Sequence, residues 1–174
     1  MSGIESITHQ NEKLHTGIDT VAALRDHLAE MTSDEVRDAL DTALAFFRHE
    51  VAPHARAEER VFYPEVSRVL GIELGERMVG EHRYIGSLVG DVTELRHRIA
   101  VDGMVPTELY GALSNLIDMV RAHLRLEAEV LQRMGEGKLS ESELYFLYER
   151  MENAEFDAVS GLSSPSGDQV TTIR

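Results

Sequence analysis

The stretch Phe46–Val66, FFRHEVAPHARAEERVFYPEV, decides how this sequence is interpreted. It contains two histidines, four glutamates and two prolines among apolar residues. Residues four apart lie on one face of a helix, so His54 stands one turn before Glu58, with aromatic and aliphatic residues on either side. A buried charge on such a face is costly unless it is paired or bound to a cation. Either this face is solvated, or it holds a metal.

The rest of the chain also has the pattern of amphipathic helices. Apolar residues recur every three or four positions, the breaks are rich in glycine, and strand signals are nearly absent. Thr32 or Ser33 is placed to cap the second helix, and Pro53 invites a kink within it. We therefore expect helices over residues of about 4–30, 34–70, 74–100, 107–134 and 140–157.

Four long helices joined by short turns predict an all-α fold, an up-down-up-down four-helix bundle. The expected organisation is a bundle over residues 1–135 and an additional C-terminal helix over 136–157, packed on or beside it. The Ser/Gly-rich segment 158–174 is expected to be a disordered tail.

The composition excludes several classes of function. The 174 residues carry a net charge of −14, which opposes broad contact with nucleic acid or an anionic membrane. No signal peptide or membrane-spanning stretch is evident, so a cytoplasmic location is expected. The chain has no cysteine, which excludes disulfides, thiolate zinc sites and iron–sulfur clusters. Any metal must therefore be held by nitrogen and oxygen ligands.

A second pair with the same spacing lies further along the chain. His123 precedes Glu127 by one helical turn, in the sequence HLRLE. Chance alone gives roughly one such pair in a chain of this composition, so the pairs by themselves are weak evidence. Each pair, however, follows a single histidine further up the chain. His15 precedes the pair His54 and Glu58, and His82 precedes the pair His123 and Glu127. A repeated helical hairpin would bring these six side chains to one point in the bundle.

Other polar residues near these positions have simpler explanations. Glu59 and Glu81 adjoin ligand candidates but are rotated by about 100° around the helix, so a solvated face or a salt bridge is expected for each. Tyr63 is expected to be a packed aromatic rather than a donor to the site. His49 lies five residues before His54 and points about 140° away on a regular helix.

The order and spacing of the six residues resemble the hemerythrin-like domain, the HHE cation-binding family, over about residues 5–135. The resemblance implies a four-helix bundle around two Fe ions, a non-heme di-iron centre bridged by two carboxylates and an oxo or hydroxo group. It assigns His54 and His123 as terminal ligands, Glu58 and Glu127 as bridges, and His15 and His82 as caps. Donor chemistry alone leaves manganese and zinc open as well as iron.

Oxygen-carrying hemerythrins have a fifth histidine one turn from the ligand on the third helix. The corresponding positions here are Met78 and Gly86, so that ligand is missing. Glu81, Tyr63 or water are the alternatives for its place. The expected function is to bind or sense dioxygen, nitric oxide or peroxide. The alternatives are a peroxide-decomposing enzyme and an iron-storage or structural metal-binding module, in a monomer or homodimer.

Overall fold

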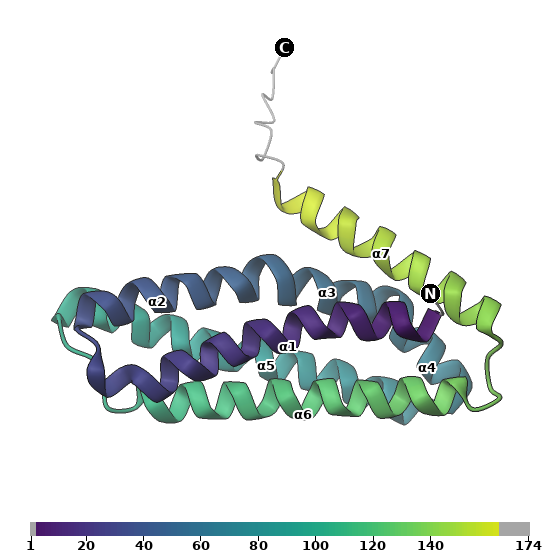
Figure 1. Ribbon diagram of the computed structural model, residues 1–174, viewed down its shortest axis with the longest axis horizontal. Helices are drawn as coiled ribbons and strands as arrows, with labels where there is room; N and C mark the ends of the chain where they lie inside the picture. The colour runs from purple at the N-terminus through teal and green to yellow at the C-terminus, as the bar shows by residue number, and fades with distance from the viewer. Residues whose placement is uncertain (1–2, 164–174) are drawn as a thin grey trace, which may run out of the picture.

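The computed structural model describes the backbone of residues 3–163 and the side chains of residues 11–160. Within that range the chain forms helices and no strands. The helices form rods that lie side by side, with chain direction alternating from one to the next, and the last helix lies across one end (Figure 1). The predicted all-α four-helix bundle is confirmed. Its α-helices are α1 (Gly3–His27), α2 (Ser33–Phe46), α3 (Ala52–Ala57), α4 (Tyr63–Leu70), α5 (Ile72–Asp102), α6 (Leu109–Gly135) and α7 (Glu141–Ser163).

The second rod begins at a capping box. The Thr32 backbone N–H donates to Glu35 Oε2 at 2.8 Å, and the Glu35 N–H donates to Thr32 Oγ1 at 3.3 Å. These bonds satisfy backbone donors that a helix start leaves without partners. Thr32 is therefore the cap, one of the two residues that the sequence offered, while a 3₁₀ turn over Leu28–Glu30 ends the first rod.

Two π-helical turns interrupt the second rod, η2 (Phe47–Val51) and η3 (Glu58–Phe62). In each, the residue after the turn donates its N–H to a carbonyl five positions back, Ala52 to Phe47 and Tyr63 to Glu58. Pro53 and Pro64 are each the second residue after one of these two turns, and neither has an N–H to donate to the carbonyl four residues before it. The expected kink at proline is thus a widened turn, which changes the direction of the residues after it.

The third rod follows the second after a single non-helical residue. Gly71 has a φ of 120°, a conformation that side chains with a Cβ rarely adopt. One turn into α5, a Cβ at Gly75 would lie 3.1 Å from the backbone carbonyl of Tyr63 and against the Ser67 side chain. Helices α4 and α5 therefore lie in close contact, and this contact fixes Tyr63 beside α5.

The buried apolar side chains form two clusters along the bundle. One includes Phe47, Ile85 and Leu124, and the other includes Ala57 and Val130. On the second rod and on α6, the boundary between the two clusters falls between these residues, and on α5 it falls between Ile85 and Met78 of the second cluster. That is where the sequence places the two His-x-x-x-Glu pairs and His82. The candidate ligands thus interrupt an otherwise apolar core.

Helix α7 belongs to the second cluster. It buries Leu144, Leu147, Met151 and Ala154, which lie three or four residues apart. It packs against α1, α3 and η3. The helix continues past the predicted end at residue 157, so residues 158–163 correct the expectation of a disordered tail there. The remainder of that predicted tail lies outside the described residues. No helix within the described part of the chain is long and apolar enough to cross a bilayer.

Candidate metal centre

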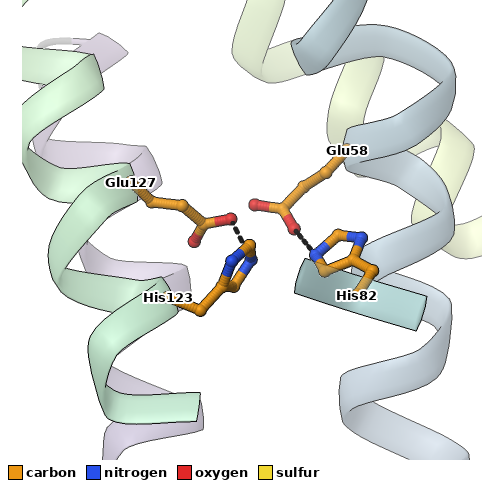
Figure 2. A group of neighbouring side chains, drawn as sticks. All are labelled: Glu58, His82, His123 and Glu127. Carbon is orange, nitrogen blue, oxygen red and sulfur yellow. Dashed lines mark ion pairs between the residues drawn. The ribbon is translucent and has the colours of Figure 1, made fainter. Parts of the chain in front are cut away.

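Four of the predicted ligands meet in the centre of the bundle. Glu58, His82, His123 and Glu127 each offer one ligand atom, and these atoms all lie within 4.8 Å of one another. Figure 2 shows the two carboxylates extending toward each other from facing helices, with the two imidazole rings beneath them. The rings of His82 and His123 are 4.6 Å apart between centroids. Such a group of nitrogen and oxygen donors is suited to a metal cation.

His54 lies at the edge of this group. Its Nε2 is 3.2 Å from Glu58 Oε1, and the side chain is 4% exposed. Despite this distance, Nε2 makes no hydrogen bond in the described structure, and neither does the buried Oε2 of Glu127. Buried polar atoms without partners are uncommon in proteins, because the loss of hydration is not compensated.

The hydroxyl of Tyr63 occupies the middle of the cluster. It donates to Glu127 Oε1 at 2.9 Å and lies 3.3 Å from Glu58 Oε2. It is also 2.9 Å from His82 Nε2 and 3.1 Å from His123 Nε2. Tyr63 therefore contacts all four members of the cluster, and the expectation of a merely packed aromatic is wrong.

His54 at the edge of the cluster and the two histidines within it each present Nε2 to the centre and Nδ1 to a carboxylate on another helix. We refer to His54, His82 and His123 as the three clustered histidines. His82 Nδ1 is 3.0 Å from Glu59 Oε1, and His123 Nδ1 is 2.9 Å from Glu81 Oε2. His54 Nδ1 is 3.8 Å from Glu155 Oε2, which comes from α7. A carboxylate behind a metal-binding histidine fixes the tautomer and the ring orientation. We refer to these three glutamates, Glu59, Glu81 and Glu155, as the outer carboxylates.

The ionisation of the cluster reflects two buried carboxylates among histidines. Burial lowers the pKa of His123, but contacts with Glu127, Glu58 and Glu81 outweigh burial and raise that pKa to about 9. Burial likewise opposes the charged form of His54, yet Glu58, Glu155 and Glu127 raise its pKa well above the usual range.

The two buried glutamates cannot both carry a charge without cost. Burial and the neighbouring Glu58 raise the pKa of Glu127, whereas the contacts with His54 outweigh burial and lower that of Glu58. Burial and the same two carboxylates raise the pKa of Tyr63, so its phenol keeps its proton. Negative charge thus concentrates on Glu58, which favours a cation at this place.

His15 is not brought to the cluster. Its side chain is exposed and lines a separate hollow with Asn11, between α1 and α6. The buried face of α1 is formed by Leu14, Ile18 and Val21. His15 is rotated by about 100° around the helix from the buried Leu14, so its side chain lies at the side of the bundle. The geometry therefore differs from the expectation that His15 caps one metal ion.

For Glu59 and Glu81 the sequence predicted a solvated face or a salt bridge, and the structure has both as ion-pair partners, each with a histidine of the site. Each adjoins a ligand candidate in sequence but contacts the histidine of the neighbouring helix instead. Their position directly beside a ligand candidate was the signal for this contact, since the side chain of such a glutamate can reach the histidine on the next helix. Glu155 had no such signal, because it depends on how α7 packs.

The residues in the cluster fit a metal centre. Three imidazole nitrogens, two carboxylates and one phenol oxygen converge, two buried ligand atoms lack hydrogen-bond partners, and the sequence has no cysteine thiolate to compete with them. Nitrogen and oxygen donors of this kind suit iron, manganese and zinc. The positions at which a fifth histidine would stand hold Met78, which is buried in the core, and Gly86, which has no side chain.

A sequence model of the hemerythrin HHE cation binding domain matches residues 2–134. The chain belongs to this family. No curated protein and no solved structure matches the chain. The match contains the whole cluster and ends at the close of α6, so α7 with Glu155 is an addition to the hemerythrin HHE domain.

Proposed function

We propose that the cluster holds a pair of iron ions and binds a small ligand: dioxygen, nitric oxide or peroxide. The observation that carries this proposal is the arrangement of His54, His82 and His123 around two buried glutamates, each ring backed by an outer carboxylate. Membership of a cation-binding family supports a metal at this place. Two facing His-x-x-x-Glu pairs, one on α3 and η3 and one on α6, support a pair of ions rather than one.

The proposed ligands are the three clustered histidines, Glu58, Glu127 and Tyr63. The Tyr63 oxygen provides the donor that the missing fifth histidine does not. Its pKa is raised by burial and by the two carboxylates, and a cation held by those carboxylates would reverse their influence on the phenol. Iron bound here supplies a reversible change of oxidation state and a coordination position for a small ligand.

The protein itself orients and protects the centre. Glu59 and Glu81 hold the rings of His82 and His123 with Nε2 inward, Glu155 lies behind the ring of His54, and apolar clusters border the centre on either side. Tyr63 and Glu127 share a hydrogen bond in the cluster, which fixes the phenol before any ligand enters.

Absorption spectroscopy during ligand addition tests the function. Protein loaded with iron under reducing conditions is titrated with nitric oxide, and separately with peroxide after oxidation. The proposal expects saturable spectral changes in the parent protein and in a His97→Gln variant, whose exposed histidine lies away from the cluster. It expects none in Glu58→Ala. Absence of any change in iron-loaded protein would contradict it.

Decomposition of peroxide is the second candidate, because a cavity leads from the surface to the cluster and the phenol of Tyr63 in that cluster carries a proton. Oxygen release from added peroxide distinguishes the two. Two molecules of hydrogen peroxide would yield one of dioxygen and two of water, with Tyr63→Phe slower than the parent protein.

A further inference from the structure

A cavity of about 380 Å³ opens beside the metal centre, between the second rod and α5. Its inner end is formed by the cluster, including His54 and Glu127, which carry the two buried ligand atoms without hydrogen-bond partners. The cavity is therefore continuous with the centre. The cavity also extends beyond the centre, along η2 and α5.

The cavity is larger than dioxygen, nitric oxide or peroxide requires. A diatomic molecule or peroxide needs one or two water volumes, about 30–60 Å³. Pockets that hold organic ligands begin at about 300 Å³. At about 30 Å³ for each non-hydrogen group, the cavity accommodates roughly a dozen such groups. It has room for a small organic molecule.

The wall away from the cluster is apolar. Phe47 and Val51 line it from η2, Ile85 and Val89 from α5, and Val120 from α6. None of these side chains offers a hydrogen-bond donor or acceptor. A ligand that fills this part of the cavity needs a hydrocarbon body, because a buried polar group here would lose its hydration without compensation.

Three arginines line the open side, and the partly exposed Glu59, which also lines the cavity, is paired with His82. The exposed side chains of Arg48, Arg56 and Arg83 line the cavity from η2, α3 and α5. No ion pair joins any of the three to an acidic group within the described part of the chain, although Arg56 Nε donates to the Ala52 carbonyl. On a protein with a net charge of −14, three such arginines around one opening are placed to bind an organic anion.

Small residues keep the opening clear. Ala52 and Ala55 face it from the second rod and Gly86 from α5. A Cβ built on Gly86 meets nothing within 4 Å. A larger side chain at this position would therefore narrow the entrance without a clash with the backbone.

We propose that this cavity binds a medium-chain carboxylate, with its hydrocarbon chain along the apolar wall and its carboxylate at Arg48, Arg56 and Arg83. This inference goes beyond the proposed function and does not depend on the metal, since neither the arginines nor the apolar wall contributes a ligand to it.

Isothermal titration calorimetry with decanoate tests the proposal, with 1-decanol and decylammonium as matched neutral and cationic probes. We expect saturable binding of one decanoate per chain, at least tenfold tighter than either probe. Arg83→Gln should weaken decanoate binding by about tenfold, as expected for the loss of one charge-assisted contact. Arg125→Gln, on the exposed face of α6 outside the cavity, should leave it unchanged.

Gly86→Leu provides a second test that does not endanger folding. Leucine favours the helix more than glycine does, and the site is open, so the variant should fold at least as well as the parent chain. Its affinity for decanoate should be at least tenfold lower than that of the parent chain. Gly90→Leu is the matched control, because Gly90 is equally open on the next turn of α5 but does not line the cavity.

Absence of saturable decanoate binding overturns the proposal. So does equal affinity for decanoate and 1-decanol, or equal binding by Gly86→Leu and Gly90→Leu. Metal content is measured on the same samples, before and after chelation. Protein that holds no iron but binds decanoate would support this inference while contradicting the proposed function.

Discussion

Replacement of Glu81 tests whether the outer carboxylates position the histidines of the candidate metal centre. Glu81 Oε2 lies 2.9 Å from Nδ1 of His123, and its side chain is 16% exposed. Glu59 is at 3.0 Å from Nδ1 of His82 but is 40% exposed. Both contacts have the length of a charge-assisted hydrogen bond, so burial decides their relative strength.

The expected loss of metal affinity follows from these values. A hydrogen bond to a charged group contributes about 1.5–3 kcal/mol, which corresponds to roughly 10- to 150-fold in a binding constant. Glu81→Ala should therefore weaken metal binding by about 10- to 100-fold, the range seen when such partners are removed. Glu59→Ala should weaken metal binding only a few-fold, because solvent screens the more exposed pair of Glu59 and His82.

Competition against a chelator of known affinity measures both changes on metal-loaded protein. Glu76→Ala is the control, since this exposed residue lies on the same helix as Glu81. Thermal unfolding of the metal-free variants shows whether the fold is intact. If Glu81→Ala retains the parent affinity, or if Glu59→Ala is the more damaging change, the positioning role would be refuted.

Three further results are expected. Tyr63→Phe should remove a visible phenolate-to-iron absorption band from the iron-loaded protein, and persistence of that band would show that Tyr63 is not a ligand. Glu155→Gln should accelerate metal release several-fold relative to Glu152→Gln, its exposed neighbour on α7, because it lies behind His54; equal release rates would show that α7 does not act on the centre. The metal-free protein should lose up to about 3 kcal/mol of stability as pH rises from about 6.5 to 9. His123 has a higher pKa in the folded protein than in the unfolded chain, so its protonation stabilises the fold fully below the unfolded pKa and no longer does so above the folded pKa. Denaturant unfolding at several pH values measures this loss. The metal-loaded protein should show the opposite trend, since protons compete with metal for the ligands, and parallel trends would contradict this reasoning.

The sequence was sufficient to predict the helices and the two His-x-x-x-Glu pairs. Helical periodicity depends only on local spacing, and the structure has helices near every predicted range. The pairs His54–Glu58 and His123–Glu127 face each other because both lie on the buried sides of facing rods. Their role as metal ligands stays a prediction.

Contacts between helices were not accessible to the same reasoning. They depend on the rotation of each rod, and a π-helical turn or a one-residue change in register alters that rotation. Such a register leaves His15 at the side of the bundle, whereas the close contact at Gly75 brings Tyr63 to the centre. Periodicity did not distinguish these two cases, because both residues adjoin apolar positions.

The packing of α7 is a further feature that local pattern did not reveal. The apolar spacing of Leu144, Leu147 and Met151 predicts a buried face but not the surface that it covers. In the structure that surface includes α3, which brings Glu155 near His54. An element outside the family domain thus reaches the candidate metal centre.

Metal analysis of the purified protein tests the central claim most directly. Iron and zinc are quantified per chain in the parent protein, in Glu58→Ala, and in His97→Ala as a control away from the cluster. The proposed centre predicts a pair of irons per chain in the parent and in His97→Ala, and loss of iron in Glu58→Ala. A single zinc, no metal, or equal iron content in Glu58→Ala and the parent would contradict it.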